Sequence, residues 1–178
     1  ARLMQSGVDL FAVANVKEAM DIREMGSGWP VLILGPLLEE EDQTLLEYNL
    51  IPTLSDESEL NRFIKIGKKQ GKPLPIHLKV DTGMGRMGCW WEKAPSLLAK
   101  VLQTPEVELQ GVLTHFPLPH DFDFTNLQRE RFLEVICPAI SAKPNLLVHA
   151  DNSSSLQSMG RNSPFNGIRI GLLQFGVA

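Results

Sequence analysis

The chain is poor in the residues that mark several classes of protein. It has two cysteines in 178 residues, Cys89 and Cys137, with no CxxC pair and no metal-like spacing to histidine. We therefore expect two free thiols and a cytoplasmic protein. Tyrosine is scarcer still, since Tyr48 is the only one.

Charge and hydropathy exclude further classes. The charged fraction is 21% and the net charge is −4, so no basic excess points to nucleic acid. The apolar runs are strand-sized, which excludes a membrane span, and the first residues lack the pattern of a signal peptide. The hydrophobic fraction of 43% suits a single globular domain over residues 1–178. The chain opens on Ala1 in a helix-like stretch, so we expect a fragment.

Short apolar runs recur at regular spacing, and helix-like stretches follow most of them. The predicted strands are 8–14, 29–35, 50–54, 75–82, 107–116, 145–152 and 167–176. The predicted helices are 15–26, 37–49, 55–71, 94–103 and 124–140, with Ser55 as the expected N-cap of the third. This alternation implies parallel strands with helical crossovers. It predicts an α/β fold, a TIM-type (β/α)8 barrel one strand short, with an open doubly wound sheet as the alternative.

The predicted strand 75–82 carries polar residues on one face. The period of two turns the apolar residues at 76, 78 and 80 towards the helices and turns His77, Lys79 and Asp81 into the barrel. A lone buried charge is costly, so these side chains must be paired or functional. A buried ion pair between Lys79 and Asp81 is the structural alternative.

The segment GMGRMG, residues 83–88, fits the G-x-G-x-x-G pattern of dinucleotide-binding loops. Glu106 and Glu108 even lie at about the right distance for that motif. However, the preceding strand is polar on one face, and CWWEKAP is a poor start for a phosphate-binding helix. We expect instead that the glycines allow a sharp turn, which presents Arg86 over the strand ends.

Further polar residues gather where later strands end. They are Thr114, His115, His149, Asn152, Ser153, Arg169 and Gly171. Each has a plainer interpretation, as a satisfied core histidine, a helix cap or a surface arginine. Because barrel active sites are built at the carboxyl ends of the strands, their coincidence predicts a functional site there.

The stretch HLKVDTGMGRMG, residues 77–88, resembles the signature strand and loop of alanine racemases, bacterial pyridoxal-phosphate (PLP) enzymes that supply D-alanine for peptidoglycan. The segments LFAVANVKEAMDIREMG, PVLILG, GVLTHF, VHADNSSS and IRIGLLQFG stand in the family's order and spacing. The resemblance implies PLP as cofactor, an amino acid as substrate and a homodimer for the full-length protein.

The resemblance also implies a role for each residue of the loop side of the site. Arg86 binds the phenolic oxygen of PLP and helps to place the substrate carboxylate. Lys79 matches a lysine that is carbamylated to N6-carboxylysine in several members, where the new anion orients the arginine. Asp81 supports this strand, and His115 lies against the cofactor ring.

The remaining roles concern the phosphate and the pyridine nitrogen. Ser153 and the backbone of Gly171 and Leu172 bind the phosphate, with Asn152 in support. Arg169 faces the pyridine nitrogen with His149 behind it. Because an arginine keeps its proton, the ring is a weaker electron sink and side reactions are discouraged.

Both bases of the family are missing from this sequence. The Schiff-base lysine belongs to a first-strand motif like VKANAYGHG, and the tyrosine belongs to a C-terminal β-domain and acts from the partner subunit. Tyr48 matches no catalytic position, and Phe175 replaces the tyrosine usual in LYG. We expect a partial barrel without catalytic bases. The alternatives are a serine or broad-specificity amino-acid racemase and a non-catalytic barrel that serves as an interaction module.

Overall fold

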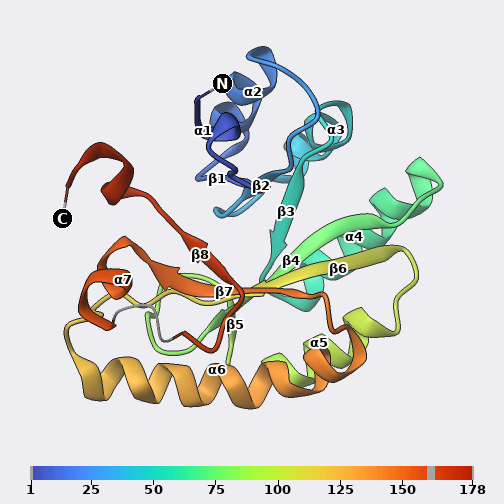
Figure 1. Cartoon of the computed structure of the whole chain (residues 1–178). Coiled ribbons are helices and arrows are strands. Elements are labelled where there is room, and N and C mark those ends of the chain that lie inside the picture. Colours follow the sequence, from blue (N-terminus) through green and yellow to red (C-terminus); the bar gives the residue numbers. More distant parts are fainter. Residues whose placement is uncertain (1, 160–162, 178) are drawn as a thin grey trace.

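The computed structural model describes residues 2–159 and 163–177, in which a parallel sheet curls into most of a barrel (Figure 1). The strands are β1 (Phe11–Val13), β2 (Val31–Ile33), β3 (Ile51–Leu54), β4 (Leu74–Asp81), β5 (Cys89–Trp90), β6 (Val107–Leu113), β7 (Leu147–Asn152) and β8 (Gly167–Arg169). They pair in the order β1-β2-β3-β4-β6-β7-β8, with β5 beside β4. A doubly wound sheet reverses its strand order, and this one does not. The barrel prediction is therefore confirmed and the alternative is wrong.

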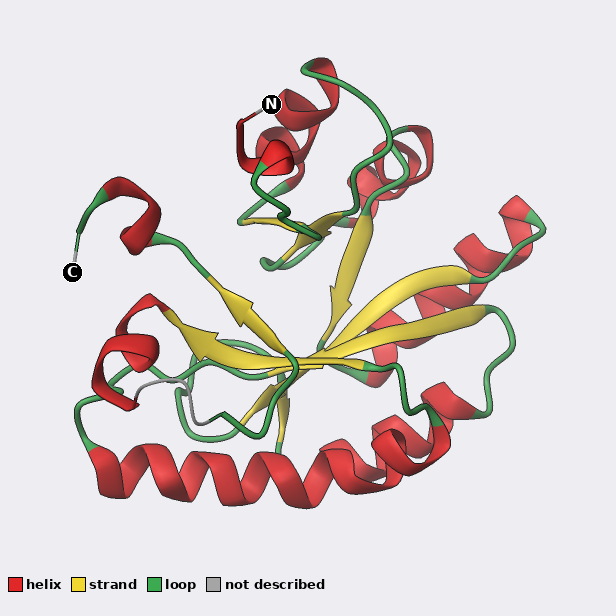
Figure 2. Cartoon of the chain, viewed as in Figure 1, coloured by secondary structure: helices red, strands yellow, loops and turns green. Residues whose placement is uncertain are grey.

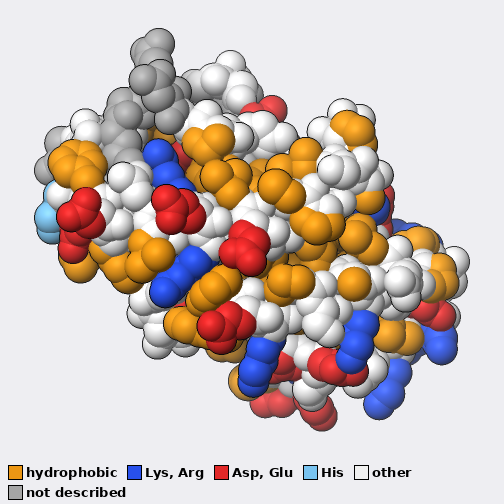
Figure 3. Space-filling view, turned by 90° about the horizontal axis from the view of Figure 1, so that it is seen from below, with side chains coloured by type: hydrophobic (Ala, Val, Ile, Leu, Met, Phe, Trp, Pro, Cys, Tyr) orange, Lys and Arg blue, Asp and Glu red, His pale blue; other side chains and the backbone are white. Residues whose placement is uncertain are grey.

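Helices cover the outer side of this sheet (Figure 2). They are α1 (Arg2–Gln5), α2 (Val16–Glu24), η1 (Glu39–Glu41), α3 (Asp42–Glu47), α4 (Glu57–Gln70), α5 (Ala94–Leu102), α6 (Phe122–Ala142), α7 (Ser153–Met159) and η2 (Leu172–Phe175). The outer face seen from below, over α6, mixes hydrophobic with charged side chains (Figure 3). No helix in the described ranges combines the length and apolar character needed to cross a membrane.

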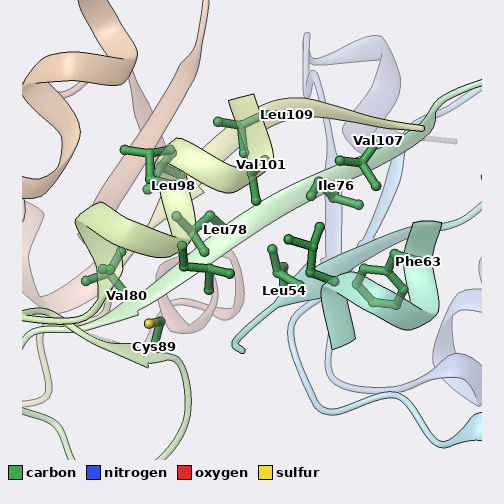
Figure 4. Packing of buried hydrophobic residues seen from close by; sticks show 14 of the residues in the cluster. Leu54, Phe63, Ile76, Leu78, Val80, Cys89, Leu98, Val101, Val107 and Leu109 are labelled. Carbon is green, nitrogen blue, oxygen red and sulfur yellow. The ribbon is translucent and has the colours of Figure 1, made fainter. Parts of the chain in front are cut away.

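Strand β4 lies in the middle of the core. Its apolar residues pack against α4, α5 and β6 in one cluster that includes Phe63, Ile76, Leu78, Val80, Leu98, Val101 and Leu109 (Figure 4). The alternation predicted for this strand is confirmed, because the residues between these apolar positions lie on the other face, where the polar site is built. Cys89 also joins the cluster, and both cysteines are free thiols as expected.

The start of α4 differs by one residue from the prediction. Asp56 is the N-cap, and its Oδ1 accepts a hydrogen bond of 2.9 Å from the N–H of Glu59. The carboxylate of Glu59 accepts in turn from the N–H of Ser55 at 2.6 Å. Ser55 is therefore wrongly predicted as the cap: its amide is satisfied by Glu59, and the helix begins after Asp56.

Two further differences concern strands. The predicted strand 167–176 is only three residues long, because β8 pairs with the end of β7 and the chain then turns at Gly171 into the short helix η2. Strand β5 was not predicted. It follows the glycine loop directly and pairs with the end of β4, with Val80 opposite Cys89.

Candidate functional site

Arg169, the last residue of β8, joins the ends of three neighbouring strands. Its Nη1 donates to the carbonyl oxygen of His149 at 2.6 Å and to Nδ1 of the same residue at 2.9 Å. Its Nη2 donates to the carbonyl oxygens of Thr114 at 2.7 Å and Ala150 at 3.2 Å, and lies 3.4 Å from Nδ1 of His115. Within the described residues Nε has no partner, so one N–H of the guanidinium is available to a ligand.

The charge of Arg169 is not neutralised by a direct ion pair in the part of the chain that the structure describes. Burial lowers the pKa of Arg169 to about 10, against the opposing effect of Asp151. The guanidinium therefore keeps its proton at neutral pH. A ligand atom that faces Nε receives a hydrogen bond from it and no proton.

Two histidines continue the contacts of Arg169 into the barrel. Because arginine can only donate, Nδ1 of His149 must accept, and its Nε2 must carry the proton. That proton points at Nδ1 of His77, at 2.9 Å, so His77 carries its own proton on Nε2. Burial, with the charge of Arg169, lowers the pKa of His77 to about 4 and that of His149 well below its usual range. Both rings are therefore neutral and held in one tautomer.

Lys79 lies on the same face of β4, one pleat beyond His77, and is buried. Burial lowers the pKa of Lys79 to about 8, and the nearby charges of Arg86 and Arg169 lower it in the same direction, against Asp81. Burial also lowers the pKa of His115 to about 4, and the charges of Arg169 and Arg86 act in the same direction. The structure thus brings Lys79, Arg86, His115 and Arg169 within electrostatic reach of one another.

Asp81 does not pair with Lys79. Its Oδ1 accepts hydrogen bonds from the N–H groups of Gly83 at 2.9 Å and Gly85 at 3.1 Å, and none of the ion pairs among the described residues joins Asp81 to Lys79. Gly85 has a φ of 69°, in the region that glycine adopts without strain. Asp81 therefore folds the loop that carries Arg86, and the predicted ion-pair alternative is wrong.

The same loop cannot be a dinucleotide fingerprint. Gly88 leads into strand β5, and α5 begins only at Ala94. The helix N-terminus that receives a pyrophosphate is therefore absent from the end of the motif. Arg86 itself is exposed at the tip of the loop, free to approach a ligand above the strand ends.

Backbone donors converge on Ser153 at the start of α7. Its Oγ accepts from the N–H of Gly171 at 3.0 Å and from that of Leu173 at 3.3 Å. A Cβ placed on Gly171 meets nothing within 4 Å, so the space beside these donors is open. The N–H of Leu172 makes no hydrogen bond among the described residues. Asn152, the residue before Ser153, is held in place because its side-chain amide donates to the carbonyl of Phe116 at 2.9 Å.

Comparison with known proteins identifies the family. The sequence profile described as "Alanine racemase, N-terminal domain" matches residues 1–178. The chain belongs to this family. An alanine racemase from Treponema pallidum is 34% identical over 98% of the chain, and one from Carboxydothermus hydrogenoformans is 36% identical over 98%. The alignments cover 48% of each of these proteins, so the chain spans about half the length of the curated relatives it matches.

Solved alanine racemases share the fold. The enzyme from E. faecalis is 30% identical, with a TM-score of 0.81 over 97% of this chain and 47% of the solved one. The enzyme from Clostridium difficile 630 reaches a TM-score of 0.89 at 23% identity, over 97% and 46%. A histidine racemase from Leuconostoc mesenteroides also has this fold, with a TM-score of 0.83 at 21% identity over 98% and 47%. The fold of alanine racemases is therefore shared by a racemase named for another amino acid.

Sequence reasoning missed a buried polar group behind the alanine racemase signature loop. Gln128 of α6 donates hydrogen bonds to Oγ1 of Thr82 and to the carbonyl of His115. Arg131 of the same helix donates to the carbonyl of Thr82. Gln128 is fully buried on the apolar face of its helix, four residues before Phe132. A polar residue within the apolar stripe of an amphipathic helix was the signal that could have found it.

Proposed function

We propose that this chain provides the cofactor-binding face of a PLP-dependent racemase that interconverts L- and D-alanine. The observation that carries the proposal is Arg169, whose charge is held by carbonyl groups and neutral histidines and whose Nε is available. The family is one of racemases, and the curated relatives are named alanine racemases. The proposal includes a homodimer, a cytoplasmic location and a supply of D-alanine for peptidoglycan, all implied by the resemblance.

The donors of the site fit the two ends of PLP. Ser153, with the backbone N–H groups of Gly171 and Leu172, is suited to the phosphate. An anion could accept from the N–H of Gly171 in place of Ser153, and from the N–H of Leu172, which has no partner among the described residues. Nε of Arg169 is suited to the pyridine nitrogen, which accepts a hydrogen bond. His115 would lie against the ring, and Asn152 would keep the phosphate side in place.

Arg86 and Lys79 are suited to the opposite side of the cofactor. Arg86 would bind the phenolic oxygen and the carboxylate of the amino acid. Lys79 repels Arg86 as an ammonium, and its lowered pKa, about 8, leaves a larger fraction of free amine at neutral pH than an ordinary lysine has. That amine can attack CO2 and lose a proton to give a carbamate. The carbamate anion would attract Arg86 and hold it over the site.

Bound PLP supplies an electron sink that makes the α-hydrogen of an amino acid acidic. Arg169 would limit this effect, since it would donate a hydrogen bond to the ring nitrogen and keep its own proton. Removal and return of the proton need one base on each face of the substrate. The resemblance assigns these steps to a lysine and to a tyrosine of the partner subunit, and neither matches a residue of this sequence.

The test uses the full-length protein, purified with PLP and given L-alanine. We expect D-alanine to form, and we expect L-serine to be a poorer substrate by kcat/KM. Arg169→Lys keeps a positive charge but loses the fork of donors, so the dissociation constant of PLP should rise by about tenfold or more. Lys65→Gln, on the exposed face of α4, is the matched control and should bind PLP normally.

The outcomes separate the rival functions. A larger kcat/KM for serine or another amino acid would make the protein a serine or broad-specificity racemase. Binding of PLP without racemisation of any amino acid would favour the non-catalytic interaction module. Absence of PLP binding would refute the proposal as a whole.

A further inference from the structure

One turn of α6 reaches the ends of three strands at the mouth of the barrel. Gln128 contacts the residues that follow β4 and β6, Arg129 pairs with Asp151 of β7 at 3.4 Å, and Arg131 contacts the residue that follows β4. None of these helix residues belongs to the proposed cofactor site. Of the three, Gln128 is the one that lies directly behind both the Arg86 loop and His115.

The amide of Gln128 has only one orientation that fits its surroundings. Its Nε2 lies 3.2 Å from the carbonyl oxygen of His115 and 3.1 Å from Oγ1 of Thr82. A carbonyl oxygen can only accept, so the nitrogen, not the oxygen, must face His115. Both hydrogens of this one amide group are thereby used to join the end of β4 to the end of β6.

The hydroxyl groups beyond Gln128 extend the connection. Oγ1 of Thr82 lies 2.8 Å from Oγ1 of Thr114, and both side chains are buried. Because Thr82 accepts from Gln128, its own proton is free to point at Thr114. The carbonyl of Thr114 accepts from Arg169. The contacts thus run without a break from α6 to the guanidinium that the proposed function places against the cofactor.

Arg131 holds the same loop through its backbone. Its Nη1 donates to the carbonyl of Thr82 at 2.9 Å, and its guanidinium lies over the ring of Trp91 at 5.1 Å. Asp81 fixes the loop from the barrel side by accepting from Gly83 and Gly85. The Arg86 loop is therefore held from the barrel side by a carboxylate and from the helix side by α6.

The oxygen of the Gln128 side chain is buried and has no partner in the described part of the chain. A buried acceptor without a hydrogen bond is unfavourable, and an apolar side chain of similar size would avoid it. The helix nevertheless carries glutamine at this fully buried position. The two hydrogen bonds from its nitrogen are the compensating gain, and both end on segments that carry proposed cofactor ligands.

We propose that Gln128 is a positioning residue: it clamps Thr82 to His115 and so holds the Arg86 loop and the His115 ring at the distance that the cofactor requires. The inference deepens the proposed function, on which it rests. Gln128 touches neither cofactor nor substrate in this arrangement. Its effect passes through the main chain at the ends of β4 and β6.

The experiment measures amide hydrogen exchange in the full-length protein without cofactor, for two pairs of variants. Gln128→Met removes both donors at nearly constant volume, and Glu130→Gln, exposed on the same turn, is its control. Thr82→Val removes the hydroxyl but keeps the shape of the side chain, and Thr82→Ser keeps the hydroxyl. The dissociation constant of PLP is measured for the same proteins.

We expect Gln128→Met to speed exchange about fivefold or more in residues 82–88 and 114–117, and to raise the PLP dissociation constant about tenfold, as loss of buried hydrogen bonds implies. Thr82→Val should speed exchange more in 82–88 than in 114–117, because the bond from Gln128 to His115 remains although the contact with Thr114 is lost. Both controls should behave like the unmodified protein. If Gln128→Met does not fold, the Thr82 pair still decides the question.

Unchanged exchange in both segments, or an even increase over all strands, would overturn the inference, because the first shows no clamp and the second shows only a general loss of stability. Normal PLP affinity in Gln128→Met would also overturn it. If the unmodified protein does not bind PLP, the proposed function fails, and the exchange data still show whether Gln128 clamps the two segments.

Discussion

Replacement of Gly111 by alanine should disturb the site from a position that no ligand touches. Gly111 lies in β6 opposite His77 of β4, and a Cβ added to it would lie 2.5 Å from both Nδ1 and Cε1 of the His77 ring. Ordinary contact begins at 3.4 Å, so the ring must move by about 1 Å. The hydrogen bond of 2.9 Å from His149 to His77 cannot survive that movement.

The magnitude follows from two losses. Overpacking of a well-packed site costs about 1–3 kcal/mol, and the lost hydrogen bond costs about 1 kcal/mol. We therefore expect Gly111→Ala to lower the free energy of unfolding by about 2–4 kcal/mol, measured by urea unfolding of the full-length protein without cofactor. His149 would then lose the acceptor of its Nε2 proton. The ring that accepts from Arg169 would be held less firmly, so PLP should bind more weakly through Arg169.

The control is a double-mutant cycle with His77→Ala, which removes the ring that the new methyl group meets. In that background Gly111→Ala should cost less than in the unmodified protein, because the ring is gone and only the contact of 2.9 Å with the backbone carbonyl oxygen of Leu147 remains. Equal costs of Gly111→Ala in both backgrounds would refute the reasoning. So would a single variant within about 0.5 kcal/mol of the unmodified protein.

Three further predictions follow from the same structure. Gly67→Ala should destabilise the protein although alanine favours helices by about 1 kcal/mol, because its Cβ would clash with the carbonyl of Glu106; a raised urea midpoint would refute this. The free energy of unfolding should fall as the pH drops from about 7 towards 4, since the folded protein holds His77 and His115 at a pKa of about 4 whereas the unfolded chain protonates them near 6.5; equal urea midpoints at pH 7 and pH 5 would contradict it. The 178-residue chain alone should form no D-alanine and should aggregate through its unpaired β1 and β8 edges, whereas a monomeric, reversible thermal transition would argue against this.

Much of the fold could be predicted because it depends on local periodicity. The alternation of residues 76–81 predicted which face of β4 enters the barrel, and the runs of apolar residues predicted the order of strands and helices. The predictions failed where the extent of a short strand is set by pairing with a strand far away in the sequence. Strand β8 stops after Arg169 because β7 ends there, and β5 exists because β4 offers it an edge.

The site shows the same division. Which residues gather at the strand ends follows from the sequence alone, because parallel strands present their carboxyl ends on one side and the side-chain period is two. Which atoms meet depends on the register and spacing between strands far apart in the chain. The separation of Asp81 from Lys79, the fixed tautomers of His149 and His77, and the reach of Gln128 from α6 to His115 all arise from contacts of that kind. The sequence does not identify the partners in such contacts, because each partner is chosen by the packing of the whole barrel. Even Gln128, a polar residue in an apolar stripe, does not show by its position that it reaches His115.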